Sequence, residues 1–307
     1  MRKLKIMKGM TVMSNIKLIT DSGSDISIET AQKLGIRLLP ISYTFDGETY
    51  YREGVDMSKE EFYEKLADKN APIPKTAQIT PIQYVDAYNE EIDNGYDTLI
   101  VVTISAKGSG MYQNAVLSAQ EVMDERDCEI IVVENLGFSC MYGAPVIHAA
   151  HMLNDGKGKD EILEYLKDAL CGIKAYFLVD ELSHLKKGGR INAATLVLAS
   201  MLEIKPVLDI KDGLVVQDGS LRGSKKLMKK LVGKAKNDGY DLSGKTVFVV
   251  NSAIPVMAEE LKTEITEAFP DAEIKELQIG AVIGCHGGPG LVGFLFSGKY
   301  NFEDFEG

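Results

Sequence analysis

The apolar run at residues 98–104 restricts the fold of this chain more than any other segment. A strand that is apolar on both faces is expected where helices cover both faces of a parallel sheet. Similar strand-like runs lie at residues 16–20, 36–41 and 129–133, and helical patterns separate them. This alternation predicts an α/β fold whose N-terminal, largely parallel sheet is flanked by helices.

Several helices of the first half have recognisable starts. Ser58 and Glu61 have the spacing of a capping box, and Pro81 suits a first helical turn. These signals start the helices predicted at residues 58–67 and from Pro81 onward. Further helices of the first half are predicted at residues 28–34, from the loop at residues 105–110 to Met123, and at residues 142–153 and 159–171.

The second half is predicted to be a smaller α/β domain with a mixed sheet. The chain has 307 residues and exceeds the size at which one core usually keeps growing, so two domains are expected. Lys211-Asp212-Gly213 has the composition of a hairpin turn. We place the boundary near Lys174, which gives domains of residues 14–174 and 175–307. Strands are expected at residues 175–179, 204–210, 214–217, 246–250, 273–277 and 291–296, and helices near 192–202, 225–236 and 256–268.

Composition argues against several classes of protein. The formal net charge of −11 does not suit a general binder of nucleic acid or anionic membranes. Apolar runs stay shorter than a membrane-spanning helix requires. The four cysteines are widely spaced and form no CxxC pair, as expected for reduced thiols. A cytoplasmic protein without a membrane span is therefore predicted.

The segment Gly284–Gly290 contains four glycines and one titratable side chain, His286. Glycine lets the backbone approach a ligand closely. Exposed amides, an imidazole and apolar runs on both sides suit a small anionic group attached to an apolar chain. A glycine-rich turn between two strands is the simpler interpretation, and the segment alone does not decide between the two.

Three other segments place polar groups where an anion could bind. Ser109 lies in a glycine loop between a strand and a helix, where free helix amides bind anions. Thr76 lies shortly before the helix that begins near Pro81, and Arg190 ends the basic cluster Lys186-Lys187-Gly188-Gly189-Arg190. Helix capping and an exposed turn are the simpler explanations of these segments.

Two motifs are rejected on their context. Residues 239–246 match the Walker A spacing, but a helix precedes them and a strand follows, the reverse of a phosphate-binding loop. His148 and His151 share a helix face without a third ligand nearby, so we interpret them as structural and predict no metal site. No catalytic triad or acid–base pair is apparent.

The chain resembles the DegV family of bacterial fatty-acid-binding proteins over residues 16–302. The most specific match is the block from Leu178 to Ile191, which contains Lys186-Lys187-Gly188-Gly189-Arg190. Further matches are Leu18-Ile19-Thr20-Asp21-Ser22-Gly23-Ser24-Asp25, Thr76-Ala77-Gln78-Ile79-Thr80, Ile104-Ser105-Ala106-Lys107-Gly108-Ser109-Gly110 and Gly284-Cys285-His286-Gly287-Gly288-Pro289-Gly290.

The resemblance implies that one long-chain fatty acid, such as palmitate, lies in a tunnel between the two domains. It implies no cofactor and no catalytic residue. Some relatives present the bound acid to a fatty acid kinase, which phosphorylates the carboxylate. The implied carboxylate ligands are Thr76 and Ser109, which we expect at one sheet edge because each precedes a helix. Gly110, Arg190, His286 and Gly287 are expected around them.

The chain also departs from the usual family pattern. Ala77, Ile79, Met111, Cys285 and Gly287 replace polar residues or proline. Lost hydroxyls imply a sparser head-group network, or water in their place. A hydrolase or acyltransferase with Ser109 or Thr76 as nucleophile and His286 as base is the alternative function.

Overall fold

A parallel four-stranded sheet forms the centre of the N-terminal half. The structure, a computed structural model, describes residues 15–68, 71–192, 204–223 and 225–305. The sheet has the order β2 (Arg37–Leu39), β1 (Ile16–Asp21), β6 (Thr98–Val102) and β7 (Glu129–Val133), and all neighbouring strands are parallel. All five residues of β6 are buried, as the apolar sequence predicts.

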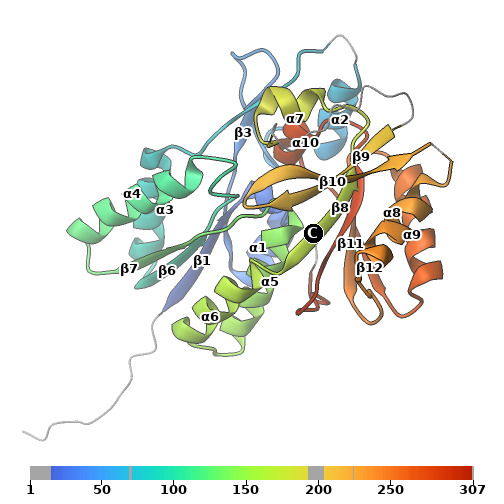
Figure 1. Cartoon of the computed structure of the whole chain (residues 1–307). Coiled ribbons are helices and arrows are strands. Elements are labelled where there is room, and N and C mark those ends of the chain that lie inside the picture. Colours follow the sequence, from blue (N-terminus) through green and yellow to red (C-terminus); the bar gives the residue numbers. More distant parts are fainter. Residues whose placement is uncertain (1–14, 69–70, 193–203, 224, 306–307) are drawn as a thin grey trace, which may run out of the picture.

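Helices cover both faces of this sheet (Figure 1). One layer consists of α3 (Pro81–Asp93) and α4 (Met111–Glu125), and the other of α1 (Ile28–Leu34), α5 (Cys140–Asn154) and α6 (Lys159–Ala169). The short 3-10 helix η1 (Ser22–Ser24) follows β1. The predicted α/β fold with a flanked parallel sheet is therefore confirmed.

A small antiparallel sheet was not predicted. It has the order β4 (Tyr51–Arg52), β3 (Ser42–Thr44) and β5 (Lys75–Ala77), and it includes Thr76. Helix α2 (Lys59–Ala67) lies between β4 and β5 in the chain and begins with the predicted capping box of Ser58 and Glu61. Strands of two or three residues are too short for a periodic sequence pattern to show.

The C-terminal half contains a mixed six-stranded sheet, as predicted. Its order is β10 (Leu214–Arg222), β9 (Ile204–Lys211), β8 (Ile173–Leu178), β13 (Val292–Ser297), β11 (Thr246–Asn251) and β12 (Glu273–Gln278). Within this sheet, β11 and β12 are the only described neighbours that pair in parallel, and the other described pairs are antiparallel. The remaining helices are α7 (Ser183–Gly188), α8 (Leu227–Asn237), α9 (Pro255–Ala268) and α10 (Ala281–Gly287).

Side chains of this mixed sheet alternate between two hydrophobic clusters. Tyr176 and Val249 belong to the cluster formed with α8 and α9. Their neighbours Phe177 and Val250 belong to the larger cluster, which also contains the core of the first half. The period of two residues in a strand therefore directs one face of the sheet toward the N-terminal half. The division into domains near Lys174 stays a prediction.

The β9–β10 hairpin has the predicted Asp-Gly turn. Asp212 and Gly213 have φ angles of 51° and 78°, which a two-residue hairpin turn with both φ values positive requires. The helix predicted near residues 192–202 falls almost entirely outside the described residues. The segment Lys186-Lys187-Gly188, for which an exposed turn was the simpler explanation, forms the second half of α7, and Gly189 ends this helix in the left-handed conformation.

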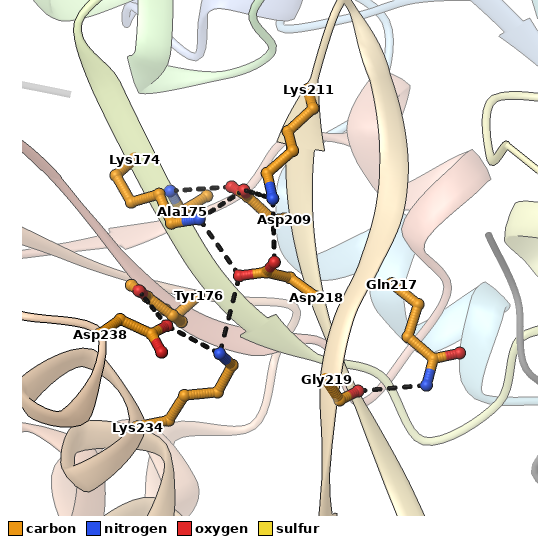
Figure 2. Close-up of polar contacts among 10 residues, drawn as sticks. All are labelled: Lys174, Ala175, Tyr176, Asp209, Lys211, Gln217, Asp218, Gly219, Lys234 and Asp238. Carbon is orange, nitrogen blue, oxygen red and sulfur yellow. Dashed lines mark hydrogen bonds and ion pairs between the residues drawn. The ribbon is translucent and has the colours of Figure 1, made fainter.

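A network of alternating charges ties the hairpin to the rest of the mixed sheet (Figure 2). At its centre the Nζ atom of Lys174 lies 2.6 Å from Oδ2 of Asp209, a carboxylate that is only 1% exposed. The same ammonium lies 3.2 Å from Asp218 on β10. Lys211, Lys234, Tyr176 and Asp238 extend the network to α8. Pairing offsets the cost of burying the Asp209 carboxylate.

We expect Asp209→Ala to lower the free energy of unfolding by about 1–3 kcal/mol, because Lys174 and the Ala175 amide lose a charged hydrogen-bond acceptor. Urea denaturation measures this change. The matched control is Glu259→Ala, which removes an exposed partner of Lys262 and should cost at most about 0.5 kcal/mol. Equal effects of the two variants would show that the buried network does not stabilise the sheet.

Candidate functional site

A cavity of about 510 Å³ lies between the two halves of the chain. The small sheet and the loops after β6 and β7 line one part of it, through residues such as Ala77, Ile104 and Phe138. The mixed sheet lines another part through Phe177 and Leu295. A cavity of this size and largely apolar lining has the properties of a small-molecule site.

The apolar wall follows from the alternation of the mixed sheet. Five of its strands each direct at least one side chain into the cavity, namely Ala175 and Phe177, Ile210, Val215, Val250, and Leu295. Helices α7 and α10 add Leu185, Val282 and Ile283. The two helices lie next to one another near α2 and β3 (Figure 1).

A hydroxyl and an imidazole meet at the polar part of the cavity. Oγ1 of Thr76 and Nε2 of His286 are 2.9 Å apart, although 210 positions separate the residues in sequence. Both side chains line the cavity. If Nε2 carries the imidazole proton, it donates to Thr76, and the Thr76 hydroxyl proton is then available to a ligand.

His286 is held in its neutral form. Burial is the main cause, and the charges of Arg190 and His184 add to it, so that the pKa of His286 falls to about 4. Its Nδ1 atom is buried without a hydrogen-bond partner in the described part of the chain. A Cβ atom on Gly188 would lie 2.3 Å from this Nδ1, so glycine is required there for space.

Arg190 links two segments of the site. Its Nε donates to the carbonyl of Gly108 at 2.8 Å, and Nη1 donates to the carbonyl of Gly188. Burial lowers the pKa of Arg190, but a guanidinium stays protonated in proteins. The side chain lines the cavity and therefore contributes a positive charge to it.

The loop that carries Ser109 is fixed by a neighbouring serine. Oγ of Ser105 donates to the carbonyl of Gly213 in the β9–β10 turn at 2.8 Å and accepts from the Gly108 amide. Ser109 lines the cavity, whereas Gly110 does not. Gly110 instead precedes α4 and contacts Gln78, which would lie 2.8 Å from a Cβ there.

Two expectations about the site geometry were wrong. Ser109 follows a strand of the parallel sheet, but Thr76 lies within β5 of the small sheet, so they do not share a sheet edge. The glycine segment is largely helical, because α10 includes Gly284, His286 and Gly287. A Cβ on Gly284 would lie 2.8 Å from a ring carbon of Phe62, so its glycine permits close helix packing.

Five of the six site residues expected from the sequence are nonetheless brought together around one cavity. Thr76, Ser109, Arg190, His286 and Gly287 all line it. Sequence reasoning did not assign Phe138 and Ser139, which also line it. Ser139 has a φ angle of 56°, an uncommon conformation that no sequence motif indicated.

The arrangement suits anion binding better than nucleophilic catalysis. A catalytic histidine needs a group that orients its second nitrogen. Nδ1 of His286 lacks such a partner among the described residues. Hydroxyls, a neutral imidazole and a guanidinium can instead surround a carboxylate with hydrogen-bond donors.

Among the described residues, no group of three or more His, Cys, Asp or Glu side chains could hold a metal ion, and no helix is long and apolar enough to cross a membrane. His148 pairs with Asp304 at 2.9 Å. The Walker A match lies between α8 and β11, so its predicted inverted context is confirmed.

The fold and the cavity together define the class of protein. It is an α/β protein with one parallel and one mixed sheet, and its apolar cavity has polar groups at one part. The chain belongs to the DegV family. The model of this family, which is described as an uncharacterised protein of the DegV family, matches residues 15–299. A DegV domain-containing protein of Halalkalibacterium halodurans is 32% identical over 282 residues, which cover 92% of this chain and 98% of that protein.

Solved structures of relatives have the same fold. A DegV family protein from Thermus thermophilus, described as binding fatty acid, is 29% identical with a TM-score of 0.80 and covers 92% of this chain and 99% of its own. A stearic-acid-binding protein from Eubacterium ventriosum is 27% identical with a TM-score of 0.79, covering 94% and 100%. The predicted family membership is therefore confirmed.

The pKa values of His286 and His148 should be shifted in opposite directions from the usual histidine value of 6.5. His286 should have a midpoint near pH 4, and His148, whose pKa is raised by its hydrogen bond to Asp304, should titrate above 6.5. NMR titration of the histidine side chains measures both, and His286→Gln assigns the signal. Because the folded pKa of His286 is lowered, it stabilises the fold above pH 6.5, and this contribution is lost as pH falls through 4. A His286 midpoint near 6.5 would contradict the buried, neutral imidazole.

Proposed function

We propose that this protein binds one long-chain fatty acid of about 14–18 carbons in the cavity. The acyl chain lies along the apolar wall, and the carboxylate lies at Thr76, Ser109, His286 and Arg190. The contact between Thr76 and His286 within an apolar cavity is the observation that carries the proposal. Fatty-acid-binding relatives with the same fold support it.

Burial of the acyl chain supplies most of the affinity in this proposal. Each buried CH₂ group contributes about 0.8 kcal/mol, so a long chain far exceeds the contribution of any single polar contact. A buried carboxylate is unfavourable unless donors replace its water. The polar groups around Thr76 offset this loss and fix which end of the ligand lies beside them.

The protein then acts as a carrier that presents the fatty acid to a fatty acid kinase. This part of the proposal rests on the family resemblance and on the inverted Walker A context, which argues against a nucleotide site at residues 239–246. In this role the kinase supplies the nucleotide, and the carrier keeps the acyl chain out of water. A hydrolase or acyltransferase that uses Ser109 is the alternative.

The ligand can be identified directly. Protein purified under native conditions and then denatured should release about one fatty acid per chain, which mass spectrometry of extracted lipids would quantify. An acyl chain buried in the apolar cavity should dissociate slowly enough to survive purification. Recovery of a nucleotide or sugar in equal amount to the protein, without lipid, would contradict the proposal.

Removal of the hydroxyl groups tests where the carboxylate lies. Thr76→Ala and Ser109→Ala should each weaken fatty-acid binding about tenfold or more, because a hydrogen bond to a charged group is worth about 1.5–3 kcal/mol. The control Thr263→Ala removes an exposed hydroxyl on α9 and should leave affinity unchanged. Wild-type affinity in the double variant Thr76→Ala/Ser109→Ala would place the carboxylate elsewhere.

The carrier role predicts no chemistry by this protein alone. Mixed with ATP and a fatty acid, the protein should form no acyl phosphate, whereas addition of a compatible kinase subunit should produce it. Acyl phosphate is detected by its reaction with hydroxylamine. Esterase turnover that Ser109→Ala abolishes would instead favour the hydrolase.

A further inference from the structure

Two carboxylates from the N-terminal half bind the start of α10. Oδ1 of Asp25 accepts a hydrogen bond from the Gly280 amide at 2.7 Å. Oε1 of Glu53 accepts one from the Val282 amide at 2.8 Å. These amides belong to the N-cap and the second residue of the helix, which lack intrahelical partners. The carboxylates therefore satisfy the helix end from segments 255 and 229 positions away.

Two further side chains hold the residues just before the helix. Nζ of Lys59 donates to the carbonyl of Gln278 at 3.0 Å, and the hydroxyl of Tyr63 donates to the carbonyl of Ile279 at 3.0 Å. Both side chains come from α2. The N-terminal half thus holds this part of the chain at four points, which are residues 278, 279, 280 and 282.

Gly280 is the point where the two carboxylates come closest to the helix. A Cβ atom there would lie 2.4 Å from Oε1 of Glu53 and 2.7 Å from Oδ1 of Asp25. A side chain at this position would displace one carboxylate. Both oxygens lie near the same point, so the two carboxyl groups are close neighbours.

Both carboxyl groups are also withdrawn from water. Asp25 is 4% exposed and Glu53 is 8% exposed. Two buried like charges in close contact disfavour each other, and one of them keeps a proton. Glu53 is the group that keeps it, because both Asp25 oxygens accept hydrogen bonds, from Gly280 and Ser139, whereas Oε2 of Glu53 has no partner among the described residues.

We propose that Asp25 and Glu53 are positioning residues that share one proton, fix the start of α10 and thereby hold His286 against Thr76. His286 lies four residues, or about one helical turn, after Val282, so a shift of the helix start moves the imidazole. This inference rests on the proposed function, because it assigns the pair a role in binding the fatty-acid carboxylate.

The arrangement makes the site sensitive to pH. Burial, and then the charge of Asp25, raises the pKa of Glu53 to about 8, and burial raises that of Asp25. Above this pH both groups are charged, repel each other and loosen the helix start. The other titratable groups that face the pair in the described part of the chain are Lys59 and Tyr63 on α2, Tyr43 on β3, Cys140 and Tyr142 on α5, and Cys285 on α10.

His286 does not titrate in this window. The pKa of His286 is lowered to about 4 by its burial, and that of Asp21, which binds the Ile104 amide, is raised to about 6 by burial. Burial raises the pKa values of Tyr63 and Cys285 far above it. A change in affinity between pH 7 and 9 therefore reports on the carboxyl pair.

The raised pKa of Glu53 also makes the free energy of unfolding depend on pH. The folded protein holds a proton on Glu53 that the unfolded chain has lost above its ordinary value of 4.5. The contribution of Glu53 to the free energy of unfolding is therefore greatest below pH 4.5 and declines as the pH rises to about 8. Glu53→Gln removes this dependence because the amide carries no titrating proton.

The test measures the affinity of the fluorescent fatty acid cis-parinaric acid from pH 7 to 9. In the wild-type protein, affinity should fall about fivefold or more as Glu53 ionises. Glu53→Gln keeps an oxygen for the Val282 amide and should bind with nearly the same affinity at every pH. Glu53→Ala should bind weakly over the whole range from pH 7 to 9. Replacement of Glu53 by glutamine, but not by alanine, should therefore retain binding.

Asp56→Asn is the matched control. Asp56 is exposed three residues from Glu53, and hydrogen bonds from Arg52 lower its pKa to about 2, so it stays ionised throughout the window. This variant should keep the wild-type pH profile. A Glu53→Gln profile that follows the wild type, or wild-type affinity in Glu53→Ala, would overturn the inference.

The experiments distinguish failure of the proposed fatty-acid binding from failure of the role proposed for Asp25 and Glu53. A wild-type protein that binds no fatty acid at any pH would refute the proposed function. Urea denaturation at pH 5 and pH 8 then tests the pair alone, and wild type should lose more stability over this range than Glu53→Gln. An equal loss in both proteins would refute the shared proton.

Discussion

The site depends on the fixation of α10 between segments distant in sequence. Asp25 and Glu53 bind the amides at its start, and Thr76 contacts His286 near its end. Glycine at positions 280 and 284 makes this possible, because a Cβ at either position would meet the carboxylates or Phe62. The polar end of the cavity is therefore built from residues of both halves of the chain.

The apolar end has a different origin. Alternate residues of the mixed sheet face either α8 and α9 or the cavity, so one set of strands builds a core and a binding wall. The charge network around Asp209 holds the β9–β10 hairpin, and Ser105 joins the tip of that hairpin to the loop of Ser109. The wall and the polar groups are thus mechanically connected.

Periodicity and turn chemistry predicted the larger elements, from the buried strand β6 to the Asp-Gly hairpin turn. They did not predict the small sheet that holds Thr76, because its strands have two or three residues. The helical state of α10 was missed because glycine disfavours helices locally and tertiary contacts override that preference. Asp25 and Glu53 carry no local signal of their role, because their partners are backbone amides of distant residues.

A crystal structure of the protein with a bound 16-carbon fatty acid tests the central claim most directly. One carboxylate oxygen should lie within about 3.2 Å of Oγ1 of Thr76, and the acyl chain should lie along the mixed sheet beside Phe177 and Leu295. His286 should keep its contact with Thr76 in the complex. A ligand with its carboxylate at the opposite end, or one bound outside this cavity, would contradict the account.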